Sequence, residues 1–447
     1  MAEIKDRYDG LVIGAGIAGM QAALDLAGQG FQVLLVERQP SIGGIMVGLN
    51  KVFPTLDCSS CICTPRMAEV AHHERITTLT YTEVQKVEPL NPGFRVTLLK
   101  KPRYVVEEDC IGCSLCELAC DVFVPHEHDY GLGARRAIYI PHSNAIPQVA
   151  VLDPEYCVFD GNCAKACPKD CIDFAQLPEE RTVEVGAVIV ASGLRITPMG
   201  AKKEYGGNQY INVMNPLAME RVQSSNGPYG HVLRPSDGKI PKSIAYVQCA
   251  GSRDASIGVP YCSRVCCMYA LKQAVIIKHE LHDTEITIYY MDIRAFGKGY
   301  EHFYRRALAE GIRVVKAKVA KIAEIENRDL LLRVELIDEG GRVADIRHDL
   351  VVLSQGLIPG WHAGAALPIQ EASDGFFEVP GLATQPARST VDGIFLAGVA
   401  TGPKDIPDAI VEAGAAAMEA AMYLDRTCSW TTTGAGQTTT GVSAGRA

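Results

Sequence analysis

Residues 8–37 constrain the fold more than any other part of the sequence. The apolar run YDGLVI leads into GAGIAG, a helix-like stretch follows, and a second apolar run, FQVLLVE, ends at Glu37. This order predicts a buried strand, a tight turn, a helix and a parallel second strand. Glycines in such a loop permit the turn, the approach of a pyrophosphate and close helix–strand packing, while the acid accepts hydrogen bonds from a ribose. We therefore expect a dinucleotide site, with the pyrophosphate at the helix N-terminus. Its loop glycines are Gly14, Gly16 and Gly19.

The residues after this unit indicate which dinucleotide binds. Glu37-Arg38 is followed by Gly43-Gly44, an E-R-x4-G-G pattern that resembles flavoproteins with two dinucleotide-binding domains. The resemblance implies FAD at the N-terminal site. It also implies that the segment GIFLAG, which ends at Gly398, holds the ribityl chain, although valine follows where that superfamily has aspartate. A purely structural turn before the last helix is the alternative. The other residues expected at this cofactor are Ser192, Gly193 and Pro407.

A second α/β unit begins with the strand SIAYVQC and continues through a helical stretch to the strand EITIYYMD. Only one of three loop glycines remains there, and a cysteine stands at the turn. The unit carries four cysteines in the spacing C-x12-C-x3-C-C: Cys249, Cys262, Cys266 and Cys267. Four thiolates at the mouth of one unit can ligate a [4Fe–4S] cluster, and buried inert thiols are the alternative. We expect a cluster in place of a pyridine nucleotide, which disfavours direct reduction by NAD(P)H.

About eighty cysteine-rich residues separate the strand GFRVTLLKK from the strand RTVEVGAVIVASG, and both strands are expected in one β-meander. We expect this segment to be a ferredoxin-like α+β domain inserted in a hairpin loop. The C-x2-C-x2-C-x3-C run of bacterial ferredoxins is followed by a second copy with Asp160 in place of a cysteine. Because the fourth cysteine of each run ligates the other cluster, one complete ligand set is Cys110, Cys113, Cys116 and Cys167. The other site is left with Cys120, Cys157 and Cys163, where Cys171 can supply the fourth thiolate or the site is three-iron or empty, so the insert holds one cluster, two or none.

Composition narrows the environment of the chain. Sixteen cysteines without a recognisable export signal indicate metal or redox chemistry in the cytoplasm rather than a disulfide framework. The net charge of −9 disfavours a nucleic-acid partner. No apolar run reaches 18 residues, so we expect no direct membrane insertion.

Four stretches together resemble the A-subunit family of heterodisulfide reductase: VFPTLDCSSCICTPRM, LLKKPRYVVEEDCIGCSLC, QCAGSRD with YCSRVCCMYALKQA, and MDIRAFGKGYEHFYRRALAEGI. The resemblance implies a [4Fe–4S] cluster at the C-x12-C-x3-C-C set beside FAD, and it places the family's flavin-tuning lysine at Lys272. It further implies partners resembling the B and C subunits of heterodisulfide reductase, and a homodimer. The chain lacks the N-terminal and C-terminal extensions of the methanogen enzyme, so electron bifurcation is not carried over. Its compact form is more similar to the corresponding protein of sulfur oxidisers.

The expected organisation is α/β, with two Rossmann-like units of the thioredoxin-reductase type and the ferredoxin-like insert. The expected segments are the FAD-binding domain in three parts (1–102, 179–240 and 351–427), the insert (103–178), the second Rossmann-like unit with its iron–sulfur site (241–350) and a disordered tail (428–447).

The role of Cys58, Cys61 and Cys63 stays open at this point. They follow Gly43-Gly44 roughly where disulfide reductases place their redox thiols, but Cys58 and Cys61 are spaced C-x2-C. A redox pair of Cys58 and Cys61, an accessory metal ligand and a packing role are all compatible with the sequence. The expected function is an FAD and [4Fe–4S] electron-transfer subunit in sulfur metabolism. The alternatives are a self-sufficient NAD(P)H-dependent disulfide oxidoreductase, the flavoprotein subunit of a quinone-linked membrane complex, and a scaffold without turnover.

Overall fold

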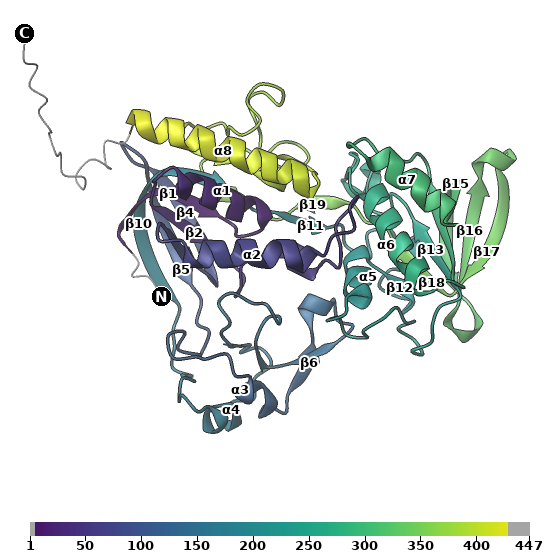
Figure 1. Ribbon diagram of the computed structural model, residues 1–447, viewed down its shortest axis with the longest axis horizontal. Coiled ribbons are helices and arrows are strands. Elements are labelled where there is room, and N and C mark those ends of the chain that lie inside the picture. Colours follow the sequence, from purple (N-terminus) through teal and green to yellow (C-terminus); the bar gives the residue numbers. More distant parts are fainter. Residues whose placement is uncertain (1–4, 428–447) are drawn as a thin grey trace, which may run out of the picture.

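The computed structural model describes residues 5–427, which form two α/β units side by side and a smaller insert below the first unit (Figure 1). The segment 428–447, for which disorder is expected, lies outside the described residues. The α/β fold class with two Rossmann-like units is confirmed.

A seven-stranded sheet forms the first unit, in the order β3-β2-β1-β10-β5-β4, with β20 beside β10. β1, β2, β3 and β20 run parallel to β10, and nearly all of their residues are buried, as in strands that are covered on both faces. The strands are β1 (Arg7–Ile13), β2 (Val33–Val36), β3 (Ile76–Leu79), β4 (Thr82–Pro89), β5 (Phe94–Lys100), β10 (Glu179–Val190) and β20 (Ile394–Leu396). The helices α1 (Ile17–Gly28), α2 (Ser59–His72) and α8 (Ile406–Thr427) bury their apolar sides together in one core on this sheet.

The insert leaves and rejoins the first sheet at neighbouring points. β4, β5 and β10 form the expected antiparallel meander, and Lys100 of β5 lies opposite Glu179 of β10. The chain between them folds into short elements: α3 (Leu115–Leu118), β6 (Phe123–Pro125), η2 (Glu127–Asp129), β7 (Ala134–Arg136), β8 (Ile138–Tyr139), β9 (Val151–Leu152) and α4 (Asn162–Ala166). Its small core includes the side chains of Cys116, Cys163 and Cys171.

The second unit is a seven-stranded sheet in the order β12-β18-β13-β14-β15-β16-β17. The strands are β12 (Val213–Met214), β13 (Ser243–Val247), β14 (Glu285–Tyr290), β15 (Arg313–Glu324), β16 (Leu330–Leu336), β17 (Arg342–His348) and β18 (Leu350–Leu353). The first five in spatial order are parallel, and β16 and β17 add an antiparallel hairpin. The helices are α5 (Pro216–Gln223), α6 (Cys266–Glu280) and α7 (Tyr300–Ala309).

The chain crosses between the units at positions other than the expected boundaries at 240 and 350. β12 pairs with β18, and α5 packs on α6, so residues 213–223 belong to the second unit. The crossing points are β11 (Leu194–Ile196) and β19 (Leu357–Pro359), which pair antiparallel with each other. The sequence boundaries were wrong because β12 is only two residues long and has no alternation to detect.

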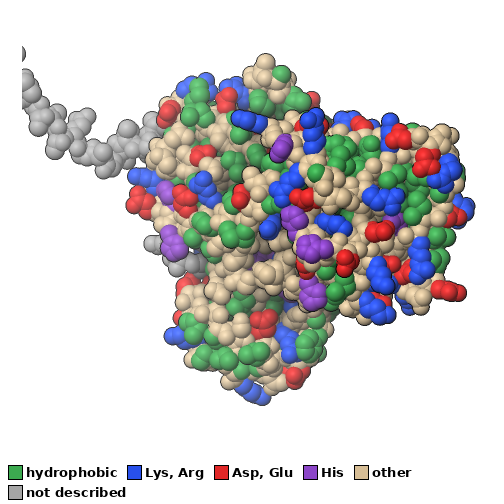
Figure 2. All heavy atoms as spheres, turned by 45° about the vertical axis from the view of Figure 1, so that its right-hand side comes forward, with side chains coloured by type: hydrophobic (Ala, Val, Ile, Leu, Met, Phe, Trp, Pro, Cys, Tyr) green, Lys and Arg blue, Asp and Glu red, His purple; other side chains and the backbone are tan. Residues whose placement is uncertain are grey.

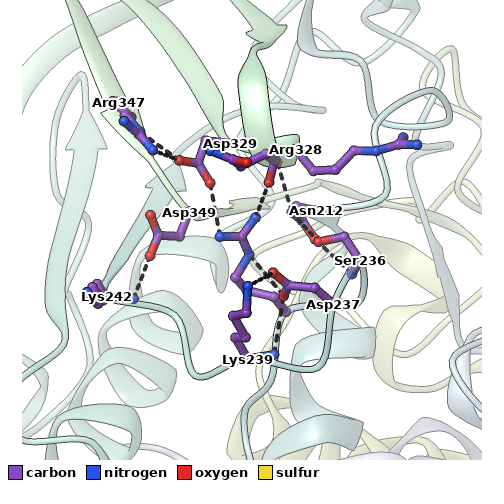
Figure 3. Close-up of polar contacts among 11 residues, drawn as sticks. Asn212, Ser236, Asp237, Lys239, Lys242, Arg328, Asp329, Arg347 and Asp349 are labelled. Carbon is purple, nitrogen blue, oxygen red and sulfur yellow. Dashed lines mark hydrogen bonds and ion pairs between the residues drawn. The ribbon is translucent and has the colours of Figure 1, made fainter.

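A buried ionic network fastens the outer hairpin of the second unit (Figure 3). Asp329, which precedes β16, pairs with Arg234 at 2.9 Å and accepts a hydrogen bond from Nε of Arg347 at 2.6 Å. Asn212 donates to Ser236 and to the carbonyl oxygen of Arg328, each at 2.9 Å. The loop before β13 is therefore fixed to the hairpin at several points.

Positive and negative side chains are interspersed over the face of the second unit in Figure 2 rather than gathered by sign. Within residues 5–427, every helix is too short or too polar to cross a bilayer.

Candidate functional site

The glycine loop between β1 and α1 is shaped by contacts that differ from glycine to glycine. Gly14 has a φ of 97°, and a Cβ there would lie 2.4 Å from the carbonyl oxygen of Ala191. A Cβ on Gly19 would lie 1.8 Å from the carbonyl oxygen of Gly14. Gly16 has nothing within 4 Å of that position, so its backbone faces open space. These are the turn, the packing contact and the open approach that a bound pyrophosphate requires.

The second glycine pair lies directly against this loop. Gly43 has a φ of 114° and donates its N–H to the carbonyl oxygen of Ala15 at 2.8 Å. Gly44 has a φ of 60°, and a Cβ on it would lie 2.9 Å from Cα of Gly16. Two segments that are far apart in the sequence therefore form one continuous glycine surface.

A cleft of about 840 Å³ opens beside these glycines. The predicted cofactor residues that line it are Gly14, Gly16, Glu37, Arg38, Gly44, Ser192 and Gly193. The predicted residues outside its lining are Gly19, Gly43, Gly398 and Pro407, each next in sequence or in space to a lining residue. Gly398, for example, has a φ of 59°, and a Cβ there would lie 2.7 Å from the Cβ of Ala18, which lines the cleft.

Glu37 is the acid at the end of β2. Its carboxylate accepts hydrogen bonds from the backbone N–H groups of Ala15 at 2.7 Å and Gln39 at 2.9 Å. Burial raises the pKa of this carboxyl, and the two backbone hydrogen bonds oppose that rise. The residue thereby fixes the glycine loop, and it also lines the cleft.

The N-terminus of α1 fits a phosphate. Gly16 is its N-cap and supplies no side-chain hydrogen bond, and the first turn contains no acidic residue. Ile17 and Ala18, which begin the helix, line the cleft. Their N–H groups lack intrahelical partners and lie at the positive end of the helix dipole, which favours an anion. The N–H groups of Ile17 and Ala18 and the open backbone at Gly16 thus suit the pyrophosphate of a dinucleotide.

The second unit brings its four cysteines together where β13 ends and α6 begins. Cys249 adopts a φ of 55° at the turn after β13, whereas Cys266 and Cys267 open α6. Burial raises the pKa of the Cys266 thiol, and the other three cysteines of the set raise it further. Burial also raises the pKa of Cys267 to about 11. Thiols that are buried within one another's electrostatic reach suit a cationic group that binds them as thiolates.

Residues next to the crossing strands, Thr197 after β11 and Gln355 before β19, pack against the loop that would carry a second nucleotide. A Cβ on Gly251 would lie 2.7 Å from the Thr197 side chain, whose hydroxyl donates to the carbonyl oxygen of Gly251 at 2.7 Å. Cys266 Sγ donates to the carbonyl oxygen of Gln355 at 3.5 Å. The space next to this loop is therefore occupied by other parts of the same chain.

The insert gathers its cysteines into two groups. One group lines a small pocket and consists of Cys110, Cys113, Cys116, Cys167 and Cys171. The other group consists of Cys120, Cys157 and Cys163, with Asp160 beside them. Burial raises the pKa of Cys163, and the charges of Cys157, Cys120 and Asp160 raise it further. The predicted set with Cys167 is therefore assembled, and Cys171 lies with it, its Sγ 3.4 Å from that of Cys167.

Within residues 5–427, no three metal-binding side chains converge on a point that a single ion could occupy. A cubane cluster differs from a single ion because each of its irons takes one thiolate, so the four ligands surround the cube instead of meeting at one point.

Cys58 and Cys61 lie at the N-terminus of α2. Cys58 is the N-cap, and its Sγ accepts a hydrogen bond from the backbone N–H of Cys61 at 3.2 Å. A further hydrogen bond from the Cys61 thiol lowers the pKa of Cys58, while Cys61 itself is exposed. Cys63 is buried, which raises its pKa to about 12. All three lie outside the lining of the cleft.

Lys272 lies in a place that the sequence did not indicate. It is buried in the middle of α6, and its ammonium pairs with the carboxylate of Glu220 on α5. The other oxygen of Glu220 accepts the backbone N–H of Asn50 at 3.0 Å, just beyond the cleft-lining Leu49. Lys272 is thus connected to the cleft through two intermediaries and does not line it, and its role toward a flavin stays a prediction.

Sequence reasoning missed several residues of the cleft. The insert supplies His126, His128 and His142 to the wall, and Lys404 and Asp405 approach from the N-terminus of α8. The H-x-H pair in VPHEHDY was a usable signal, but nothing in the sequence placed the insert against the glycine loop.

Comparisons with known proteins show which family this chain is similar to. Residues 8–417 match the family described as pyridine nucleotide-disulphide oxidoreductase. The chain is 46% identical over 418 residues to the A subunit of the H(2):CoB-CoM heterodisulfide,ferredoxin reductase of Methanothermobacter marburgensis, covering 92% of this chain and 63% of that protein. It is 47% identical over 415 residues to the iron–sulfur A subunit of the CoB--CoM heterodisulfide reductase of Methanocaldococcus jannaschii, covering 91% and 63%. The chain therefore spans less than two thirds of these relatives.

Solved structures agree on the fold. Thioredoxin reductases from T. acidophilum and Lactococcus lactis each superpose with a TM-score of 0.52 at 14% identity, covering 94% of this chain and 99% of theirs. The expected thioredoxin-reductase type of fold and the resemblance to the A-subunit family of heterodisulfide reductase are both confirmed.

Proposed function

Because this chain belongs to the pyridine nucleotide-disulphide oxidoreductase family, we propose that it is an electron-transfer subunit carrying FAD and [4Fe–4S] clusters in a heterodisulfide-reductase-like complex. One observation carries the proposal. Four cysteines occupy the mouth of the second unit, and Thr197, next to the crossing strand β11, packs against the loop that a pyridine nucleotide would need. Such a unit favours electron transfer through a cluster over hydride transfer from NAD(P)H.

The cleft of the first unit would hold FAD. Gly14, Gly16 and the first turn of α1 would take the pyrophosphate, and Glu37 with Arg38 the adenosine end. Ser192, Gly193, Gly398 and Pro407 would flank the flavin end. Bound there, FAD supplies a centre that accepts or donates electrons one at a time or in pairs.

Clusters would lie on two sides of this cofactor. Cys249, Cys262, Cys266 and Cys267 would ligate one [4Fe–4S] cluster, as their grouping and burial support. Cys110, Cys113, Cys116 and Cys167 would ligate a second, supported by the pocket that they line. Asp160 replaces a thiolate in the third group, so we assign no cluster to it.

The names of the relatives support a place in an assembly, because each describes one subunit of a reductase. We propose partners resembling the B and C subunits of heterodisulfide reductase, which would carry the disulfide chemistry, and a homodimer of this chain. We place the complex in cytoplasmic sulfur metabolism without a nucleic-acid partner.

The experiment compares electron donors with the anaerobically purified protein. Reduced methyl viologen, a one-electron donor, should bleach the flavin and cluster absorbance. NADH or NADPH at equal reducing capacity should leave both unchanged over the same time. Rapid bleaching by NADH or NADPH would contradict the proposal.

A second candidate is a self-sufficient NAD(P)H-dependent disulfide oxidoreductase that uses Cys58 and Cys61. It is favoured by the N-cap position of Cys58 and by the thiol hydrogen bond that lowers its pKa, both typical of reactive dithiols. NAD(P)H-driven release of thiols from a disulfide, lost in Cys58→Ser and retained in the buried control Cys63→Ser, would establish it. We expect no such turnover.

A further inference from the structure

The loop after β13 brings an arginine to the four cysteines of the second unit. Cys249 and Arg253 both adopt the left-handed backbone conformation, with φ values of 55° and 58°. The backbone N–H of Arg253 donates to the carbonyl oxygen of Tyr261 at 2.9 Å, and Tyr261 is followed in the chain by Cys262. The loop is thus folded back on itself, and the Arg253 side chain hydrogen-bonds to the thiol of Cys249.

Asp292, which lies just after β14, holds the guanidinium of Arg253. Its carboxylate pairs with Arg253, and its own carbonyl oxygen lies 3.9 Å from Sγ of Cys267. The same carboxylate accepts a hydrogen bond from Nε of Arg294 at 3.2 Å. Burial raises the pKa of the Asp292 carboxyl, but the Arg253 hydrogen bond and charge outweigh burial and lower it. The guanidinium is therefore fixed between this carboxylate and the Cys249 thiol.

Arg253 can serve both partners at the same time. A guanidinium has five N–H donors and no acceptor, so the ion pair with Asp292 leaves donors for a sulfur atom. A hydrogen bond from a cation to a thiolate is charge-assisted, which makes it stronger than a bond between neutral groups. Burial raises the pKa of the Cys249 thiol, whereas the Arg253 charge and hydrogen bond lower it. The arginine thus favours the thiolate form of Cys249, in which a cysteine binds iron.

The reduction potential of an iron–sulfur cluster depends on its net charge and on the hydrogen bonds that its sulfur atoms accept. One-electron reduction adds a negative charge to a cluster that four thiolates already make anionic. A cationic donor beside one of these thiolates stabilises the reduced form more than the oxidised form, so it raises the reduction potential. Residues that contact the ligands can therefore tune a metal centre without binding the metal.

We propose that Arg253, held in place by Asp292, raises the reduction potential of the second unit's [4Fe–4S] cluster through its hydrogen bond to the Cys249 sulfur. Arg253 is a positioning residue in this role, because it acts on the cluster through Cys249 and does not bind iron. The inference rests on the proposed function, which places a cluster at these four cysteines. It adds the side chain that sets how readily this cluster accepts an electron.

The test is a redox titration of the anaerobically purified holoprotein, in which EPR follows the reduced clusters. The signal that is absent from Cys262→Ala identifies the cluster of the second unit, and any signal of the insert serves as an internal reference. In Arg253→Met, the ratio of reduced to oxidised cluster at the wild-type midpoint potential should fall about tenfold, a downward shift of about 59 mV for one electron. Arg253→Lys, which keeps the charge but not the planar guanidinium, should give a smaller shift in the same direction.

The matched control is Arg294→Met. It removes a positive charge from the same carboxylate, but this guanidinium is hydrogen-bonded to Asp292 and is largely exposed. The backbone hydrogen bond of Arg294 to Cys267 is unchanged by the substitution. Because solvent and salt screen an exposed charge, the midpoint potential of this variant should stay close to that of the wild type.

Iron and acid-labile sulfide are measured in every variant. If Arg253→Met keeps its iron and the wild-type midpoint potential, or shifts no further than Arg294→Met, the role of Arg253 is overturned while the proposed function stands. If Arg253→Met loses the cluster, Arg253→Lys decides, and a wild-type potential or a lost cluster in that variant also overturns the role. Wild-type protein without a cluster at these cysteines would overturn the proposed function and this inference together.

Discussion

Gly19 shows how tightly single residues determine the cofactor loop. Its Cα lies so close to the Gly14 carbonyl that a Cβ would be 1.8 Å from the oxygen. That atom belongs to the backbone of the turn and cannot move as a flexible side chain would. Helix α1 therefore sits as close to the loop as glycine permits.

Gly19→Ala is expected to push α1 away from the loop. Overpacking of this kind costs about 1–3 kcal/mol or more of unfolding free energy, and the displaced helix should lose FAD. Gly28→Ala is the matched control, because nothing lies within 4 Å of a Cβ at that end of the same helix. Urea unfolding and FAD content measure the two variants; equal values for both would contradict this account of the loop.

The sequence predicted some site residues because their chemistry is local. Gly14, Gly16 and Glu37 lie within one strand–helix–strand unit, so their spacing alone brings them together. The place of Lys272 could not be predicted in this way. α6 is apolar around most of its circumference, so its periodicity does not reveal which side faces α5 and the Glu220 carboxylate.

At the scale of elements, the β16–β17 hairpin combines a buried and an exposed ion pair. Asp329 and Arg234 are 3% and 9% exposed, whereas Arg333 and Asp345 pair across the strands in solvent at 40% exposure or more. Coulomb attraction is screened at the exposed pair and persists at the buried one. The hairpin should therefore depend on the network of Figure 3 and not on its surface pair.

Asp329→Ala is expected to lower the unfolding free energy by about 1.5–3 kcal/mol, since the buried Arg234 guanidinium then keeps only Asp237 at 3.5 Å and the Asn327 carbonyl oxygen at 2.7 Å. Asp345→Ala removes the exposed partner from the same hairpin and should leave the stability nearly unchanged. Chemical denaturation of both variants measures the contrast. A similar loss in the two would show that the Asp329 network does not fasten the hairpin.

His348 at the end of β17 predicts a pH dependence of stability. It contacts the Ser243 hydroxyl at 2.6 Å and the Tyr289 hydroxyl at 2.9 Å, and burial lowers its pKa from 6.5 to about 4. Between these two pKa values the unfolded chain binds a proton that the folded protein does not bind. The contribution of His348 to the free energy of unfolding is therefore complete above pH 6.5 and is lost as the pH falls toward 4.

When the pH falls from about 7 to about 5, this histidine should lower the free energy of unfolding by about 2 kcal/mol. His348→Gln should flatten the pH profile by that amount, whereas His302→Gln, which changes an exposed histidine of α7, should not. Parallel profiles for the wild type and His348→Gln would exclude the buried neutral imidazole as the cause.

At the scale of the whole molecule, the long apolar strands could be predicted from the sequence, whereas the connections between the two units could not. Long apolar strands such as β1 and β10 are recognisable by composition, and the meander follows from β5 and β10 flanking the insert. The crossing between units depends on β11 and β19, which are three residues each and pair only through tertiary contact. For the same reason the sequence did not show that the insert folds back to supply histidines to the cleft.

The central claim is that one flavin lies between two clusters held by different parts of the chain. Iron, acid-labile sulfide and FAD are measured in anaerobically purified wild-type protein, Cys262→Ala and Cys113→Ala. The account predicts about eight irons per FAD in the wild type and a loss of about four in each variant, with FAD retained. Iron content that is unchanged in Cys262→Ala would contradict it, because no cluster would then stand where the second nucleotide loop has been lost.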